Sequence, residues 1–203
     1  MPKFVSQGAE VLKLRHGPHP PVHLLSDEKF ACLNGEQIYL FLVSQSELIW
    51  YGEWMESTDE ETFQVTIHRF LSAMDTAGQV CGHLEPEELY APASVTTDGW
   101  IAAHNAWKTE VSGIDLLECK RHGQKRVSVT LDEFTKTHPE GLPFQHQKLQ
   151  DDFNSILNAP SLAAYAQRVR RNRERYKDEP ILLKRLDILK EKRFLFTNRP
   201  LAD

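Results

Sequence analysis

The 203-residue sequence contains no long hydrophobic run. None of its apolar stretches approaches the ~20 residues that a membrane-spanning helix needs. Its first residues, Met1 to Phe4, are not followed by the apolar core of a secretory signal peptide. These absences favour a protein that does not associate with membranes, and we expect it in the cytoplasm.

Cysteine is also scarce, and the three cysteines are far apart in the chain: Cys32, Cys81 and Cys119. They form neither the framework of a disulfide-rich protein nor the paired spacing of a zinc site. His16, His19 and His23 lie close together, but the prolines between them prevent a preset metal-binding geometry, and we interpret them as loop histidines. We therefore expect reduced, buried thiols and no metal centre.

The chain lacks the common catalytic signatures as well. It has no phosphate-binding glycine loop, no G-x-S-x-G turn and no H-E-x-x-H helix. Without a complete catalytic constellation, we expect no cofactor and a non-enzymatic interaction or assembly protein.

Charge is distributed unevenly along the sequence. Residues 161–203 carry 12 Lys or Arg and 6 Asp or Glu, a net charge of +6, whereas the rest of the chain carries 12 against 23. Such asymmetry is typical of a protein whose two parts meet different partners, although the basic end could equally fold onto the acidic body. We expect an α+β sheet domain over residues 1–143 and a helical, basic C-terminal region over residues 144–203 that packs on it.

The strongest structural signal is a predicted meander between residues 29 and 55. Asn34-Gly35 separates two apolar runs and has the composition of a two-residue type I′ hairpin turn, because both positions accept positive φ cheaply. The second run, Ile38–Val43, is apolar throughout, and the aromatic-rich run Leu48–Met55 follows it. Three antiparallel strands are predicted.

A capped helix is predicted after the meander. Ser57-Thr58-Asp59-Glu60 has the form of a capping box. Apolar residues then recur at helical spacing as far as Gly78, which is placed to end the helix: Phe63, Ile67, Phe70, Leu71 and Met74. This helix should cover one face of the sheet.

Further elements are predicted with less direct signals. A helix, or alternatively a strand, is expected after Asp98-Gly99. Residues 114–121 and 125–131 flank His122-Gly123-Gln124 and predict a second hairpin. The fold class is therefore α+β, with an antiparallel sheet of about five to six strands. Helices are predicted over residues 145–157, from a Ser161 cap to residue 177, and from about residue 180 to 193.

The best functional signal is the basic helix that Ser161 opens. Guanidinium groups bind phosphate and carboxylate oxygens in a bidentate manner, so this helix and the start of the next could dock on nucleic acid or on an acidic protein surface. The alternative is a solvated face, or one neutralised by acidic residues of the same chain. The candidate residues are Arg168, Arg170, Arg171, Arg173, Arg175, Lys177, Lys184 and Arg185.

Two other functions remain open. Glu118-x-Lys120 on a strand would place both side chains on one face, as in metal-dependent nucleases of the PD-(D/E)xK type, although Asp115 would point to the opposite face. An ordinary cross-strand salt bridge is the alternative. Aromatic side chains could also line a small-ligand pocket, with core packing as the alternative: Trp50, Tyr51, Trp54, Trp100 and Trp107.

Overall fold

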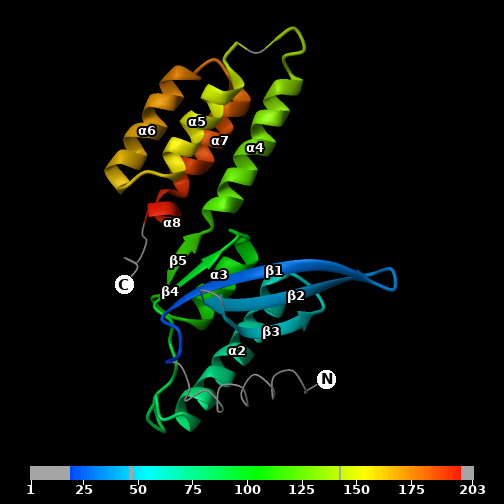
Figure 1. Cartoon of the computed structure of the whole chain (residues 1–203), viewed down its shortest axis with the longest axis vertical. Helices are drawn as coiled ribbons and strands as arrows, with labels where there is room; N and C mark the ends of the chain where they lie inside the picture. Colours follow the sequence, from blue (N-terminus) through cyan, green and yellow to red (C-terminus); the bar gives the residue numbers. More distant parts are fainter. Residues whose placement is uncertain (1–18, 46–47, 142, 198–203) are drawn as a thin grey trace. The chain divides into compact units, whose positions relative to one another are not determined.

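The structure, a computed structural model, describes residues 19–45, 48–141 and 143–197 (Figure 1). The chain divides into two compact units, Met1–Leu116 and Leu117–Asp203. We refer to them as unit 1 and unit 2. The division falls at a different place from the boundary after residue 143 that charge and composition suggested, and that domain boundary stays a prediction. In its described part the chain is α+β, with five strands and seven helices.

The predicted meander is present in unit 1, and its turn has the predicted geometry. Asn34 and Gly35 have φ values of 54° and 86°, as a type I′ turn requires. The three strands follow one another in the chain: β1 (His23–Leu33), β2 (Glu36–Gln45) and β3 (Leu48–Met55). Both pairings, β1 with β2 and β2 with β3, are antiparallel.

The sheet as a whole is mixed, which corrects the purely antiparallel sheet that we expected. Its strand order is β3-β2-β1-β4-β5, and β4 (Ser94–Thr97) pairs with β1 in parallel. The reason is the long connection after β3, which contains a helix. A crossover of this kind can return the chain to the far side of β1 in the same direction, whereas a tight turn cannot.

The predicted helix after the meander is α2 (Glu60–Val80), and its buried face contains Phe63, Ile67, Phe70 and Met74. Its cap is Asp59, whose side chain accepts a hydrogen bond from the Thr62 amide, so the cap lies two residues after the predicted Ser57. The helix continues two residues beyond Gly78.

The helix predicted after Gly99 is also present, as α3 (Ile101–Glu110). Phe41 of β2 contacts Phe63 of α2 and Trp107 of α3, with ring centroids 6.3 and 6.5 Å apart. Both helices therefore cover the same face of the sheet, and the core of unit 1 lies beneath them.

The second predicted hairpin is wrong. The segment forms a short strand, β5 (Asp115–Glu118), and then a helix, α4 (Lys120–Lys136). Val127, Leu131 and Phe134 are buried at helical spacing, and this period outweighs the short alternation that suggested a strand. Gly123, interpreted as a loop residue, lies inside α4.

Unit 2 is helical after β5, and Figure 1 shows its helices grouped side by side. Beyond α4, they are α5 (His146–Leu157), α6 (Leu162–Arg175), α7 (Pro180–Glu191) and α8 (Arg193–Thr197). Ser161 caps α6 as predicted, accepting a hydrogen bond from the Ala164 amide at 3.2 Å. All five helices contribute to one hydrophobic core, which includes Phe134, Phe153, Val169, Leu186 and Phe196.

None of the helices in the described ranges combines the length and apolar character that crossing a membrane requires.

Candidate functional site

Three of the predicted arginines bind other residues of unit 2. The Arg168 guanidinium donates to the backbone carbonyl of Ser155 in α5, and Arg175 forms an ion pair with Asp152 of the same helix. Arg168 and Arg175 are seven residues apart, so one side of α6 presents both to α5. Asn172 lies between them and donates to the Asp152 carbonyl at 3.3 Å.

The third, Arg185 of α7, donates from Nε to the Thr130 hydroxyl of α4 at 2.8 Å. Burial, and then the nearby charge of Arg126, lowers its pKa. The hydrogen bond that Arg175 donates to the Asp152 carboxylate has the opposite effect and raises the pKa of Arg175. These three arginines hold neighbouring helices together, and their guanidinium groups already have partners within unit 2.

The other side of α6 faces a groove with a volume of about 810 Å³, which we call the basic groove. Its floor is mostly apolar and its rim is mostly cationic. The floor consists of Tyr165, Ala166, Val169 and Leu183, and the rim of Arg170, Arg173, Glu174, Lys177, Lys190 and Arg193.

The sides of the basic groove come from α6, α7 and α8. Tyr165 of α6 donates its hydroxyl to the Leu189 carbonyl of α7 at 2.8 Å, which fixes the spacing between two of these helices at the floor. Burial is the main cause that raises the pKa of this tyrosine, so its hydroxyl keeps its proton. The floor is therefore built on a buried, fully bonded tyrosine.

Part of the positive charge at the rim is compensated. Arg170 pairs with Glu174 at 3.1 Å, and both side chains are well exposed, so this pair contributes only a few tenths of a kcal/mol. Arg173 pairs with Asp187 of α7. Five cations thus face two carboxylates, an excess of three positive charges.

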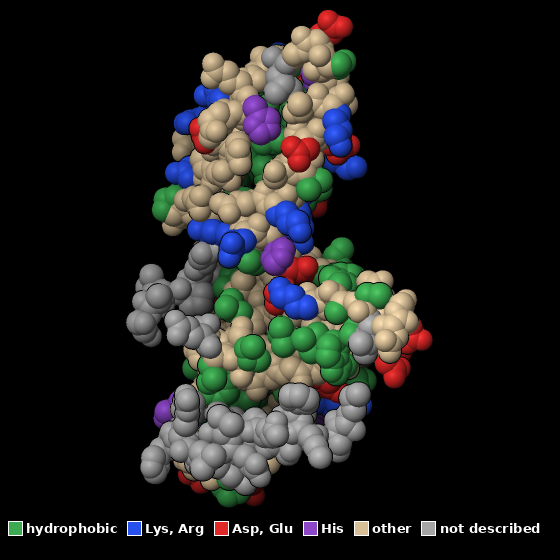
Figure 2. Space-filling model, turned by 45° about the vertical axis from the view of Figure 1, so that its right-hand side comes forward, with side chains coloured by type: hydrophobic (Ala, Val, Ile, Leu, Met, Phe, Trp, Pro, Cys, Tyr) green, Lys and Arg blue, Asp and Glu red, His purple; other side chains and the backbone are tan. Residues whose placement is uncertain are grey.

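The remaining rim cations have no acidic partner in the described part of unit 2. Lys177 and Lys190 form no ion pair there, and the Arg193 guanidinium lies over the Phe194 ring, 4.7 Å from its centroid. In Figure 2, Lys and Arg side chains are distributed over the visible surface of unit 2. The basic groove is thus a concave, cationic surface with an apolar floor.

The sequence prediction included only part of this groove. It named Arg170, Arg173 and Lys177, which the structure brings together, but it missed Lys190 and Arg193. The sequence signal for Lys190 and Arg193 was their three-residue spacing, which is the same as the spacing between Arg170 and Arg173. Two other predicted residues, Arg171 and Lys184, are exposed but do not line the groove.

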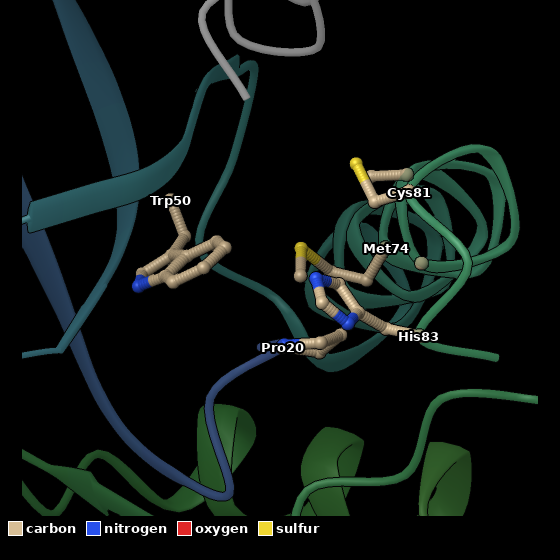
Figure 3. A pocket seen from close by; sticks show the side chains of 7 residues that line it. Pro20, Trp50, Met74, Cys81 and His83 are labelled. Atoms are coloured by element: carbon tan, nitrogen blue, oxygen red, sulfur yellow. The ribbon is translucent and has the colours of Figure 1, made fainter. Parts of the chain in front are cut away.

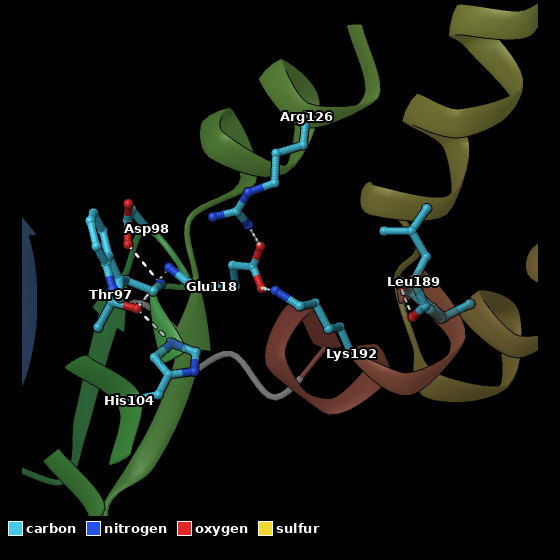
Figure 4. A network of polar contacts seen from close by, with 10 residues as sticks. Thr97, Asp98, His104, Glu118, Arg126, Leu189 and Lys192 are labelled. Atoms are coloured by element: carbon cyan, nitrogen blue, oxygen red, sulfur yellow. Dashed lines mark hydrogen bonds and ion pairs between the residues drawn. The ribbon is translucent and has the colours of Figure 1, made fainter. Parts of the chain in front are cut away.

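The geometry expected of a nuclease motif is not present. β5 ends at Glu118 and Lys120 begins α4, so the two residues do not share a strand face. Lys120 donates to the Asn158 side chain at 3.3 Å, whereas the buried Glu118 carboxylate binds Arg126 and Lys192 (Figure 4). Within the described residues, no group of three or more His, Cys, Asp or Glu side chains is arranged to hold a metal ion.

Two of the candidate aromatic residues are packed in the core, whereas Trp54 is 51% exposed. Trp107 is fully buried, and Tyr51 packs against Phe70 with ring centroids 5.5 Å apart. A small cavity beside Trp50 and Met74 has a volume of about 10 Å³ (Figure 3). Such a cavity holds at most one water molecule, so it offers no room for an organic ligand.

Of the three neighbouring histidines, His19 and His23 lie in the described part of the chain. His16 lies outside the described residues. The His19 ring contacts the His83 ring, with centroids 4.2 Å apart, and His23 forms a hydrogen bond with Ser94 at 2.9 Å.

No protein-family model matches the chain, and no curated protein matches it.

Proposed function

We propose that the protein is a non-enzymatic interaction protein whose basic groove binds an acidic segment of a partner protein. The observation that carries this proposal is the combination, in one groove, of five cationic side chains with an apolar floor. An amphipathic helix that presents carboxylates on its flanks and apolar side chains at its centre complements both features. Its carboxylates would meet Lys177, Lys190 and Arg193, and its apolar side chains would lie over Ala166 and Leu183.

Nucleic acid is the second candidate partner. Arg171 and Lys184 are exposed, and no ion pair engages either of them in the described part of unit 2. A phosphate backbone could use these two cations together with the groove rim. It would leave the apolar floor uncovered, which is why we favour a protein partner. The cytoplasmic location expected from the sequence stays a prediction.

The test is a binding measurement with two probes, a fluorescent amphipathic peptide rich in glutamate and leucine and a fluorescent single-stranded RNA. The full chain is compared with the double variant Lys190→Glu/Arg193→Glu. Reversing two rim charges should weaken peptide binding about tenfold or more, because each lost charge pair with an acidic ligand becomes a repulsion. Arg171→Glu/Lys184→Glu is the matched control, since it also reverses two charges of unit 2, at exposed residues outside the groove.

The outcomes separate the two partners. Peptide binding that falls in Lys190→Glu/Arg193→Glu and persists in Arg171→Glu/Lys184→Glu supports the proposal. RNA binding that depends on Arg171 and Lys184, without peptide binding, replaces it with the nucleic-acid function. If neither probe binds at low salt, the groove is not a docking site for anionic partners.

A further inference from the structure

Glu28 of β1 is a carboxyl group in the core of unit 1. Its residue is 5% exposed, and it lies opposite Phe41 of β2, which is fully buried. Neither carboxyl oxygen has a hydrogen-bond partner in any other described residue. Ser26, two residues earlier on the same face of β1, is 3% exposed, and its hydroxyl also lacks a partner. A buried polar group of this kind needs a physical explanation, because it is costly to maintain.

The parallel pairing with β4 brings the turn that carries a second carboxyl group alongside β1. Leu25 of β1 is in register with Thr96 of β4, so the next residues of β1 run alongside the turn that follows β4. Asp98 lies in that turn, and its carboxylate accepts a hydrogen bond from the Trp100 amide at 2.8 Å. The turn leads directly into α3, which begins at Ile101.

Other contacts involve the residues of the turn after β4. Thr97 is joined to the His104 ring of α3 at 2.6 Å, and its hydroxyl also accepts from the Gly99 amide at 3.0 Å (Figure 4). The Phe30 ring stacks on Trp100, with centroids 5.8 Å apart. These contacts depend on the turn after β4 keeping its position.

The charges around Glu28 favour its protonated form. Burial raises its pKa most, and the charges of Asp98 and Asp27 raise it further, to about 8. Its own backbone amide and Lys29 act in the opposite direction. Lys29 is itself paired with Asp27, which limits its effect on Glu28. Phe63 of α2 and Trp107 of α3 pack against Phe41, the residue opposite Glu28. His104 is the titratable residue of α3 that bonds to the turn.

We infer that Glu28 and Asp98 form a proton-dependent switch in unit 1, which holds the turn after β4 and the start of α3 in place only while Glu28 is protonated. When Glu28 ionises, its buried carboxylate and the half-buried carboxylate of Asp98 repel each other. The turn is the part that can yield, since the N-cap residue of α3, Trp100, forms no side-chain capping hydrogen bond. Loss of one proton would therefore loosen the turn and the first residues of α3, while the meander stays intact.

The direction of the pH effect follows from linkage. An unfolded glutamate has a pKa of about 4.3, well below the value of Glu28 in the folded protein. The folded state then binds more protons than the unfolded state between these two values, so stability falls as the pH rises. The contribution of protonated Glu28 is present in full below the unfolded pKa and is lost as the pH rises through the folded pKa.

Hydrogen exchange of the α3 amides in the full chain tests the switch. Wild type and Glu28→Gln are compared at each pH from mildly acidic to above 8, so the intrinsic pH dependence of exchange cancels between them. Wild type should lose protection in α3 relative to Glu28→Gln as the pH rises through about 8. Glu56→Gln, an exposed glutamate of the same unit, is the control and should behave like wild type.

A second measurement follows the ionisation of Glu28 directly. The side-chain carboxyl carbon of Glu28 should titrate in carbon-13 NMR well above the usual glutamate range, and Asp98→Asn should lower its midpoint by about one pH unit. A midpoint in the usual range overturns the inference. So does a Glu28→Gln protein whose α3 loses protection with pH in the same way as wild type.

Discussion

Lys192, which follows the last residue of α7, donates from Nζ to the carboxylate of Glu118 at 2.7 Å, although the two residues are 74 positions apart in the chain. Arg126 of α4 binds the other carboxylate oxygen. The Glu118 side chain is 1% exposed, and the two cations are each about 30% exposed, at 33% for Arg126 and 27% for Lys192. A buried carboxylate is tolerated at the end of β5 because two half-buried cations compensate its charge.

Replacing this carboxylate should destabilise unit 2. Glu118→Ala leaves Arg126 and Lys192 without their counter-charge, and we expect a loss of about 2–3 kcal/mol in the free energy of unfolding. This is near the low end for a broken buried pair, because both cations keep some contact with water. Urea unfolding followed by circular dichroism measures it. Glu191→Ala, an exposed change at the end of α7, is the control. Equal midpoints for the two variants would show that the pairing contributes little.

Gly123 should resist replacement by a larger residue, because α4 and α8 approach closely there. A Cβ atom at this position would lie 3.0 Å from a ring carbon of Phe196 and 3.4 Å from Leu157. Gly123→Leu should cost about 2 kcal/mol through overpacking, whereas the same change at the exposed neighbour Gln124 should cost little. Thermal unfolding measures both.

A double variant tests the cause of that loss. If the Phe196 ring is the obstacle, Gly123→Leu/Phe196→Ala should lose less stability than the sum of the two single changes, since the shortened side chain leaves room for leucine. If the two stability losses simply add, the strain caused by leucine at position 123 does not come from the Phe196 ring.

We expect Gly35 to contribute to stability only through its backbone conformation. Its φ is +86°, and an added Cβ would meet no atom within 4 Å, so any cost of Gly35→Ala comes from the left-handed conformation. We expect a loss of about 1 kcal/mol, and a smaller one for Gly35→Asn, because asparagine tolerates this region better. Urea unfolding of the two variants provides the comparison. A greater loss with asparagine would contradict this account.

The sequence predicted elements whose signals are local. Asn34-Gly35 and the apolar period of α2 depend on neighbouring residues, and both predictions are confirmed. The place of Gly123 inside α4 depended on distant packing, because this glycine looks like a turn residue until Phe196 is placed against it, although the apolar period of α4 was itself a local signal. The parallel direction of β4 likewise depends on a crossover that no short motif specifies.

The candidate site also combines residues that a local pattern predicts with residues that only tertiary packing brings together. Charge patterning located the cationic helix α6, but it could not show which of its sides faces another helix. Asp152 and Ser155 of α5 bind Arg175 and Arg168, and only the tertiary packing reveals this. Lys190 belongs to the groove for the same reason, because a different helix brings it opposite α6.

Asp187 should restrain the affinity of the basic groove for an acidic ligand, because its carboxylate pairs with Arg173 at the rim. Asp187→Asn removes that negative charge and frees the guanidinium, so the acidic peptide should bind about three- to fivefold more tightly at low salt. High salt should reduce the gain, since screening weakens exposed charge interactions. Fluorescence anisotropy measures both. Asp178→Asn, an exposed change outside the groove, is the matched control and should leave affinity nearly unchanged. Weaker binding by Asp187→Asn would mean instead that this carboxylate positions Arg173 for the ligand.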